Sequence, residues 1–104
     1  MYYVYILKSI NHARHYIGFT SNVEKRLQYH NKGHVKSTRP YVPWKVIHVE
    51  NYEDRNAAYK RERQIKSYKG GRAFKDLIDT RKGAGVVATA FGGVPLEAEN
   101  GILQ

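Results

Sequence analysis

Residues 2–20, with the sequence YYVYILKSINHARHYIGFT, contain two short β-prone runs separated by a polar connection. Tyr2–Leu7 is mostly aromatic and β-branched, which predicts a strand buried on both faces or nearly so. Tyr16–Thr20 is a second such run, and the connection contains the turn-forming Asn11. Because the connection is short, the two strands are predicted to form an antiparallel hairpin. Gly18 inside the second strand predicts a kink or a close approach by another chain.

Downstream of the hairpin, the pattern changes to that of a helix. Ser21 or Asn22 is predicted to cap this helix, which ends near Gly33. A loop over residues 34–43 is rich in basic and small polar side chains. It leads to a third predicted strand, Trp44–Tyr52, in which β-branched residues recur.

A second helix is predicted from about Arg55 to Lys69, capped by Glu53 or Asp54 and stopped by two glycines. Apolar residues after the glycines predict a short closing helix that contains Phe74, Leu77 and Ile78. Three short strands with interleaved helices give an α/β fold, with helices flanking a small three-stranded antiparallel sheet.

The length of 104 residues allows one domain with one modest core. We expect this domain to occupy residues 1–80. From residue 83 the composition changes to glycine and small apolar residues without lysine or arginine. Residues 81–104 are therefore predicted to be a flexible or weakly docked C-terminal tail.

The net charge of the chain is +9, from 18 basic and 9 acidic residues. Two basic and two acidic residues lie beyond residue 80, so the whole surplus belongs to the predicted domain. Such a body attracts polyanions over a Debye length of roughly 8–10 Å at physiological salt. Nucleic acid is the expected partner, and a basic protein that is merely soluble is the alternative.

The chain contains no cysteine, which excludes structural disulfides and thiolate zinc sites and suits a reducing cytosol. The apolar run at the N-terminus is too short for a membrane span or a signal peptide. We therefore expect a soluble cytoplasmic protein with no membrane partner.

Two tyrosine-bearing motifs and three later polar residues follow one another in a specific order. Tyr3-Val4-Tyr5 is followed after ten residues by Tyr16-Ile17-Gly18, and then by Arg26, His30 and Glu62. In this order and spacing, the predicted domain resembles the GIY-YIG nuclease domain. That family includes the N-terminal cutting domain of excinuclease C and small stand-alone bacterial proteins. The resemblance implies a GIY-YIG-like fold, hydrolysis of phosphodiester bonds in DNA and a setting in DNA repair.

The resemblance also implies a role for each of these side chains. Glu62 would hold one Mg²⁺ or Mn²⁺ ion, since Mg²⁺ is bound through one or two carboxylates with waters and substrate oxygens. Arg26 would present its forked cation to the scissile phosphate. Tyr16 would orient or deprotonate the attacking water, assisted by the metal or by neighbouring cations because a free phenol has a pKa of about 10. Tyr5, across the hairpin from Tyr16, would hold water or phosphate, and His30 would relay a proton or contact phosphate.

Each of these residues also has a purely structural interpretation. Tyrosine is common in the core of sheets, an arginine is typical of a basic helix surface, and the histidine fits a half-buried helix position. Ala58, Glu62 and Ile65 recur at i, i+4 and i+7, so the glutamate lies on the inward stripe of its helix. At the end of such a stripe it could instead pair with Arg26 or Arg61.

The first motif departs from the family pattern, with Tyr3 in place of its glycine and Val4 in place of its isoleucine. Only Tyr5 of this motif has a side chain that can take part in chemistry, so we expect activity to survive the exchange. Phe19 stands where the excinuclease branch has a lysine, so this chain has no cation of its own at that position.

Surface cations are the expected contacts to the nucleic-acid backbone. The principal candidates are Lys36, Arg39, Lys66 and Lys69, and the wider set adds Lys45, Arg61, Arg72 and Lys75. Contacts of this kind position a protein on its substrate without reading sequence, so little sequence specificity is expected. For any one of these residues, a solvated basic face is the alternative.

The sequence therefore predicts a metal-dependent DNA endonuclease. Two alternatives stay open, namely a non-catalytic nucleic-acid-binding module on the same scaffold and a basic structural partner in a ribonucleoprotein. Retention of Tyr5, Tyr16 and Glu62 favours the nuclease, because binding requires cations but not these groups. The strandedness of the substrate and the oligomeric state are not specified by the sequence.

Overall fold

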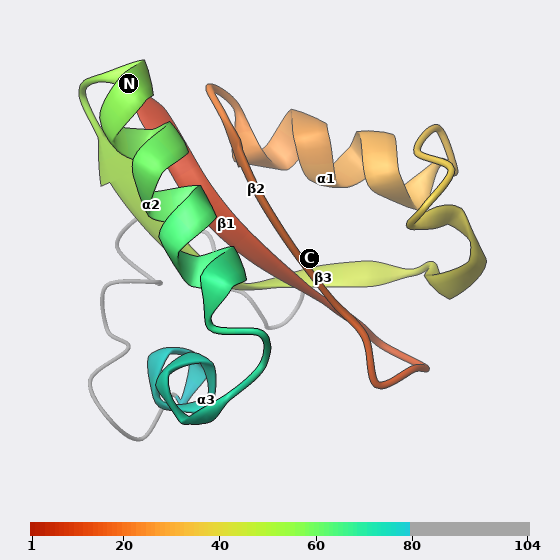
Figure 1. The fold of residues 1–104 in the computed structure, drawn as a ribbon. Coiled ribbons are helices and arrows are strands. Elements are labelled where there is room, and N and C mark those ends of the chain that lie inside the picture. Colours follow the sequence, from red (N-terminus) through yellow and green to blue (C-terminus); the bar gives the residue numbers. More distant parts are fainter. Residues whose placement is uncertain (80–104) are drawn as a thin grey trace.

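The structure, a computed structural model, describes residues 1–79 as a three-stranded antiparallel sheet with helices packed against it (Figure 1). Its elements are β1 (Tyr2–Ser9), β2 (His15–Thr20), α1 (Val23–Asn31), the short 3₁₀ helix η1 (Arg39–Tyr41), β3 (Trp44–Tyr52), α2 (Arg55–Ser67) and α3 (Arg72–Ile78). The predicted α/β fold is confirmed. None of the helices within residues 1–79 is long and apolar enough to cross a membrane. The predicted tail at 81–104 lies outside the described residues, so the domain boundary stays a prediction.

The sheet has the strand order β2-β1-β3, and β1 is antiparallel to both of its neighbours. As the sequence predicted, β1 is buried on both faces, and Val4, Tyr5, Ile6 and Leu7 are at most 1% exposed. In the hairpin register, Tyr5 lies opposite Gly18. Strands β2 and β3 form the two edges of the sheet.

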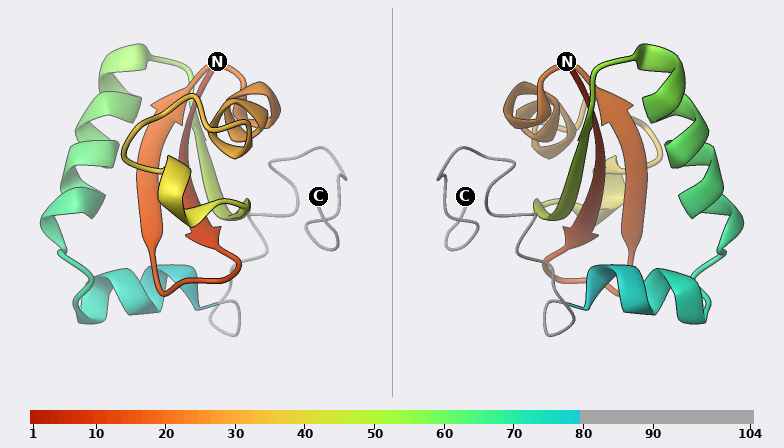
Figure 2. Two further views of the ribbon diagram at one scale, coloured as in Figure 1. Left: turned by 90° about the vertical axis from the view of Figure 1, so that its right-hand side faces the viewer. Right: turned by 90° about the vertical axis from the view of Figure 1, so that its left-hand side faces the viewer.

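Helices α1 and α2 cover opposite faces of the sheet, and α3 lies beyond the end of α2 (Figure 2). Successive residues of β1 point alternately to the two faces, which divides the core into two clusters. One cluster contains Tyr5, Leu7, Val23, Trp44, Val46 and Val49, and the other contains Val4, Ile6, Ala58, Ile65 and Phe74. The central strand thus supplies apolar side chains to both layers.

The two longer helices begin at side-chain caps that the sequence indicated. The amide oxygen of Asn22 accepts a hydrogen bond from the backbone N–H of Lys25 at 3.0 Å, and Asp54 caps α2 in a similar way. Helix α2 ends at Ser67, slightly before the predicted end, and Lys69 then takes a left-handed conformation with φ of 51°. These caps fix where the helices that carry the candidate site begin.

Candidate active site at the β2 edge

The side chain of Tyr5 lies beneath the edge strand β2, and only 1% of it is exposed. A Cβ atom at Gly18 would lie 2.7 Å from Tyr5 Oη, 2.9 Å from Tyr5 Cζ and 3.1 Å from Tyr16 Cε2. The two distances to Tyr5 are shorter than real Cβ contacts and the one to Tyr16 is tighter than most, so glycine is required for the two rings to pack as they do. The close approach at this glycine is therefore made by two tyrosine side chains of the same chain, and not by another chain as predicted. Because Gly18 is directly opposite Tyr5, Tyr16 occupies the diagonal position across the hairpin.

Behind Tyr5, a buried chain of hydrogen bonds runs through His30 and Thr38. Tyr5 Oη lies 3.3 Å from His30 Nε2, and His30 Nδ1 lies 2.9 Å from Thr38 Oγ1. The Thr38 hydroxyl donates to the carbonyl oxygen of Val35 at 3.4 Å, so it accepts the hydrogen bond from His30 Nδ1–H. That assignment leaves Nε2 as the acceptor for the Tyr5 O–H. His30 is 0% exposed and Thr38 2% exposed, so these hydrogen bonds are shielded from solvent.

The pKa values of Tyr5 and His30 show which charges lie close to them. Burial, and then the charge of Arg26, lower the pKa of His30 to about 4, so its ring is neutral at pH 7. Burial, and then the charge of Tyr16, raise the pKa of Tyr5 above its usual range; Arg26 opposes this rise and Glu62 adds to it. Arg26, Tyr16 and Glu62 are therefore all within electrostatic reach of the Tyr5 hydroxyl.

Tyr16 and Arg26 are the more accessible members of this cluster, since both are half-buried. The Tyr16 ring lies 4.6 Å from the His30 ring and 6.3 Å from the Tyr5 ring, measured between centroids. Its hydroxyl makes no hydrogen bond to any residue in the described part of the chain. The guanidinium carbon of Arg26 lies 4.9 Å from the centre of the Tyr29 ring. These two side chains can therefore meet a substrate, whereas Tyr5 and His30 support them from inside.

Glu62 approaches from the other face of the sheet, on the inward stripe of α2 that the sequence predicted, and is 8% exposed. Its Oε2 lies 2.7 Å from Lys66 Nζ. The structural alternative of a pair with Arg26 or Arg61 is wrong, because the partner is Lys66. Both α1 and α2 contact the edge strand β2, and the two helices lie on opposite faces of the sheet (Figure 2).

The donor set at this edge suits a weakly held hard cation. Glu62 offers a carboxylate, and no group of three or more His, Cys, Asp or Glu side chains that could hold a metal occurs within residues 1–79. A closed zinc site would need four such ligands. Mg²⁺ or Mn²⁺ requires only one or two carboxylates, with waters and phosphate oxygens as the other ligands, and this requirement fits Glu62.

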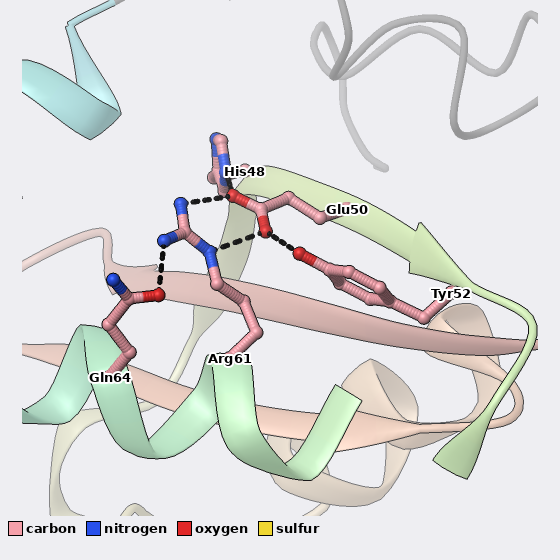
Figure 3. A network of polar contacts seen from close by, with 5 residues as sticks. All are labelled: His48, Glu50, Tyr52, Arg61 and Gln64. Atoms are coloured by element: carbon pink, nitrogen blue, oxygen red, sulfur yellow. Dashed lines mark hydrogen bonds and ion pairs between the residues drawn. The ribbon is translucent and has the colours of Figure 1, made fainter. Parts of the chain in front are cut away.

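A second acid, Glu50, forms the centre of a polar network that links β3 to α2 (Figure 3). Its Oε1 accepts hydrogen bonds from the Tyr52 hydroxyl at 2.7 Å and from Arg61 Nε at 2.8 Å. Its Oε2 accepts from Arg61 Nη2 at 3.0 Å and from His48 Nε2 at 2.8 Å. Arg61 also donates to Gln64 Oε1 at 2.8 Å. Each oxygen of the Glu50 carboxylate therefore accepts two hydrogen bonds from neighbouring side chains.

The network shifts the pKa values of its members in opposite directions. Burial favours the neutral form of Glu50, but the hydrogen bonds from His48, Arg61 and Tyr52 outweigh it and hold the pKa well below its usual range. Burial, and then the bond to Glu50, raise the pKa of Tyr52 to about 12. Arg61, which the sequence offered as a phosphate contact, is thus held by Glu50, and its role as a phosphate contact stays a prediction.

The principal predicted phosphate contacts have different surroundings. Lys36 and Lys69 are exposed. Arg39 is also exposed, but its Nε donates to the carbonyl oxygen of Gly33 at 2.9 Å and so orders the loop after α1. Lys66 forms the ion pair with Glu62. Lys36 and Lys69 thus remain simple candidates, whereas Arg39 and Lys66 have a second role.

The side chain of Arg55 lies close to Phe19, the position in β2 at which the chain has no cation of its own. The guanidinium carbon of Arg55, in the first turn of α2, lies 5.4 Å from the centre of the Phe19 ring. Phe19 also packs against Tyr59, with ring centroids 6.0 Å apart, and Tyr59 is 45% exposed. An arginine from α2 therefore lies over the aromatic ring at this position of β2.

Some members of the site were not identified from the sequence. Thr38 lies in the loop between α1 and β3, and no local pattern indicates that it orients His30. The i, i+4 spacing of Glu62 and Lys66 is a visible signal for their ion pair. The alternation of residues 48, 50 and 52 is a weaker signal, because it places their side chains on one face of β3 without naming Arg61 as their partner.

Comparison with known proteins identifies a family that the chain resembles over most of its length. A family model described as the GIY-YIG catalytic domain matches residues 1–73. A UPF0213 protein of Haloquadratum walsbyi is 41% identical over 68 residues, which cover 64% of this chain and 75% of that protein. A UPF0213 protein of Syntrophus aciditrophicus is 44% identical over 66 residues, covering 62% of this chain and 75% of the relative.

A third UPF0213 protein, from Staphylococcus haemolyticus, is 33% identical over 84 residues, which cover 77% of this chain and 96% of that protein. Among solved structures, the solution NMR structure of the UPF0213 protein BH0048 from Bacillus halodurans matches with a TM-score of 0.46 and 27% identity. That match covers 85% of this chain and 92% of the other. The residues matched by the family model include Tyr5, Tyr16, Arg26, His30 and Glu62.

Proposed function

The chain belongs to the family of GIY-YIG catalytic domains, and from this premise we propose that it is a metal-dependent endonuclease that hydrolyses DNA with little sequence specificity. The family supports a nuclease-type function on nucleic acid in general. The observation that carries the finer proposal is that Tyr16 packs against the buried Tyr5–His30 pair, with Arg26 and Glu62 within electrostatic reach of Tyr5. A module that only binds nucleic acid needs cations, but it has no use for two packed phenols beside a buried carboxylate.

Arg26 and Tyr16 would act on the reacting phosphate. The forked cation of Arg26 binds the non-bridging oxygens of the scissile phosphate, where negative charge increases in the transition state. The Tyr16 hydroxyl, free of hydrogen bonds to the described residues, orients the water that attacks phosphorus, and as the phenolate it accepts the proton of that water. The bond between phosphorus and the leaving oxygen then breaks, and the leaving alkoxide takes up a proton from solvent water.

Tyr5 and His30 would hold this arrangement in place. His30 is neutral at pH 7, because burial and then the Arg26 charge lower its pKa to about 4, so it does not repel the neighbouring guanidinium. Its Nδ1–H is fixed on Thr38, which directs Nε2 toward the hydroxyl of Tyr5. The proton-relay role predicted for His30 fits this position better than a direct phosphate contact, because both ring nitrogens are engaged and the side chain is 0% exposed.

Glu62 would hold one Mg²⁺ or Mn²⁺ ion through its carboxylate. When bound, such an ion supplies charge stabilisation for the phosphate and the leaving oxygen. The single carboxylate leaves coordination positions for water and for phosphate oxygens, which suits an ion that is completed by the substrate. The chain's own contribution is to hold this carboxylate on the buried side of α2, within electrostatic reach of Tyr5.

The charge of the chain supports nucleic acid as the substrate. The whole surplus of +9 belongs to residues 1–80, and this part of the chain contains the predicted site. Binding to phosphates releases counterions, so the logarithm of the affinity for DNA should fall linearly with the logarithm of salt concentration. The lack of cysteine fits a cytoplasmic location, which we propose together with the activity.

The activity is tested with the purified full chain and matched single-stranded DNA, duplex DNA and RNA, in Mg²⁺, Mn²⁺ or EDTA. We expect cleavage of DNA with metal and none with EDTA. The substitutions Glu62→Gln, Arg26→Ala and Tyr16→Phe should each lower the rate by ~100-fold or more, the range typical of lost electrostatic or acid–base groups. Glu24→Gln, at an exposed acid of α1, is the matched control and should cut at the wild-type rate.

Binding of the same DNA is measured in parallel, at several salt concentrations. The three site variants should retain most of their affinity, because the phosphate contacts are spread over other cations. Tight DNA binding without scission by the wild type under every metal condition would instead identify a non-catalytic binding module. An affinity that does not change with salt would remove phosphate recognition from the proposal.

A further inference from the structure

The Glu62 carboxylate, which we propose as the metal ligand, already forms an ion pair with a lysine. Lys66 Nζ lies 2.7 Å from Glu62 Oε2, one helical turn further along α2. A second i, i+4 pair, Arg72–Asp76, is longer at 3.7 Å, and its side chains are 87% and 46% exposed. The Glu62 side chain, by contrast, is only 11% exposed. The Lys66 contact is therefore with a largely buried acid, which differs from an ordinary surface pair on a helix.

A buried carboxylate requires a countercharge, because removing an ion from water is costly unless it is paired. Within residues 1–79, Lys66 is the only cation that makes an ion pair with Glu62. A divalent ion bound to the same oxygen would lie a few ångströms from the ammonium, and the two cations would repel each other. Lys66 and the metal ion are therefore competitors for one oxygen atom.

The Lys66 ammonium can move away from Glu62, and a bound phosphate would attract it. Its side chain is 51% exposed, and its flexible four-carbon stem allows the ammonium to move away from Glu62 without a change in the helix. The sequence had already placed Lys66 among the contacts to nucleic-acid phosphate. A phosphate that approaches Glu62 would offer the ammonium a second anion, and it would also offer oxygens to the metal ion.

We propose that Lys66 is a resident counter-ion of Glu62, which weakens metal binding in the free protein and moves to a phosphate when nucleic acid binds. Metal and nucleic acid then bind cooperatively, because each favours the conformation in which Lys66 has left the carboxylate. This inference rests on the proposed function, since it requires Glu62 to be the metal ligand. It makes Lys66 a positioning residue that couples substrate binding to metal loading.

The first test measures Mn²⁺ binding directly, by the electron paramagnetic resonance signal of the free ion, without nucleic acid. Lys66→Met removes the charge with little change in side-chain length, and Lys66→Arg retains a cation. Lys60→Met, at an exposed lysine of the same helix, is the matched control. We expect Lys66→Met to bind Mn²⁺ ~5-fold or more tightly than the wild type, in the range of typical coupling between sites. The other two variants should bind like the wild type.

The second test adds saturating DNA to the same titrations, in a Tyr16→Phe background that keeps Glu62 and Lys66 but is not expected to cut. DNA should tighten Mn²⁺ binding clearly when Lys66 is present and much less in Lys66→Met. Equal Mn²⁺ affinities for the wild type and Lys66→Met would overturn the inference. An equal gain from DNA in both backgrounds would also overturn it.

Glu62→Gln separates this inference from the proposed function. If the wild type cuts DNA and Glu62→Gln loses Mn²⁺ binding, the proposed function stands whatever Lys66→Met does. If Glu62→Gln binds Mn²⁺ as well as the wild type, Glu62 is not the metal ligand and both proposals fail. Thermal unfolding of each variant, followed by circular dichroism, confirms that the compared proteins are folded.

Discussion

At residue 18, the missing side chain determines how closely the two site tyrosines pack. The space that a Cβ atom would need is filled by the hydroxyl and Cζ of Tyr5 and by the ring of Tyr16. Gly18 is not in a left-handed conformation, so its importance here lies in the space it leaves free rather than in its backbone freedom. Beneath it, His30 is buried in a neutral state between two polar partners.

Gly18→Ala is expected to destabilise the protein, because the added methyl group would lie 2.7–2.9 Å from two atoms of Tyr5. Overpacking of this kind costs about 1–3 kcal/mol, which urea unfolding at neutral pH measures as a lower midpoint. In the double variant with Tyr5→Phe, the atom at 2.7 Å is absent, so part of the loss should be recovered. An unfolding midpoint for Gly18→Ala equal to that of the wild type would show that the rings can move aside freely.

His30 predicts a pH dependence of stability. Its folded-state pKa of about 4 lies below its ordinary value of 6.5, so the unfolded chain binds the proton more readily between these values. The His30 contribution to the free energy of unfolding should therefore be fully present above pH 6.5 and should be lost as the pH decreases toward 4. Below pH 4 it should not change further, because His30 is then protonated in both the folded and the unfolded state. At 1.36 kcal/mol per pKa unit, the total loss is on the order of 3 kcal/mol.

The measurement is a series of urea unfolding curves for the wild type and for His30→Gln, which cannot titrate in this range. The difference between the two proteins should shrink as the pH falls from 6.5 to 4. His15, whose pKa is also lowered, first by burial, is present in both proteins and cancels in the difference. Parallel curves over this range would mean that His30 is not buried as a neutral ring.

At the scale of elements, the site depends on how α2 is held against the sheet. The helix carries Glu62 on its inward stripe, and the residue before it, Arg61, binds Glu50 of β3 through two nitrogen atoms. Glu50 is also fixed by Tyr52 and His48 from its own strand (Figure 3). One residue of α2 therefore anchors the helix to β3, while the next presents a carboxylate to the site.

Arg61→Ala is expected to destabilise the fold by ~1–3 kcal/mol, because it leaves the largely buried Glu50 without its cation. Lys60→Ala, at the preceding exposed position, should change stability by less than ~0.5 kcal/mol. Urea unfolding of both variants makes the comparison. Equal midpoints for the two variants would mean that the network in Figure 3 contributes nothing to the attachment of α2.

At the scale of the whole molecule, the sheet has two layers of helices and a site at one of its edges. Tyr5 and α1 belong to the core on one face, whereas α2 packs on the other, and both helices contact β2. A phosphate at this edge can therefore meet groups from both layers. Both core clusters, and every residue of the proposed site, lie within residues 1–79.

Truncation after Lys82 is therefore expected to leave a folded and active protein. The deletion removes two acidic and no basic residues, so the remaining chain is more positive and should bind DNA at least as tightly as the full chain. Circular dichroism, DNA binding and the cleavage assay on the two lengths provide the test. Loss of folding or cleavage on truncation would show that residues 83–104 contribute to the domain.

Local sequence patterns were sufficient to predict the helices and strands. The bounds of β3, the caps at Asn22 and Asp54 and the inward stripe that carries Glu62 follow from neighbours within a few residues, because strand and helix periodicities are local properties. The order of the two tyrosine motifs, Arg26, His30 and Glu62 was enough to indicate the family.

Only the tertiary structure decided which partners these residues have. The engagement of Arg61 by Glu50, the bond from His30 to Thr38 and the packing of Tyr5 against Gly18 each join parts of the chain that are separate in sequence. The type of a residue determines which bonds its side chain can make, but the arrangement of strands and helices determines which groups lie close enough to bond with it. For this reason, the sequence indicated the chemistry of the site, whereas the fold determined which charges are buried, which are paired and which are left accessible.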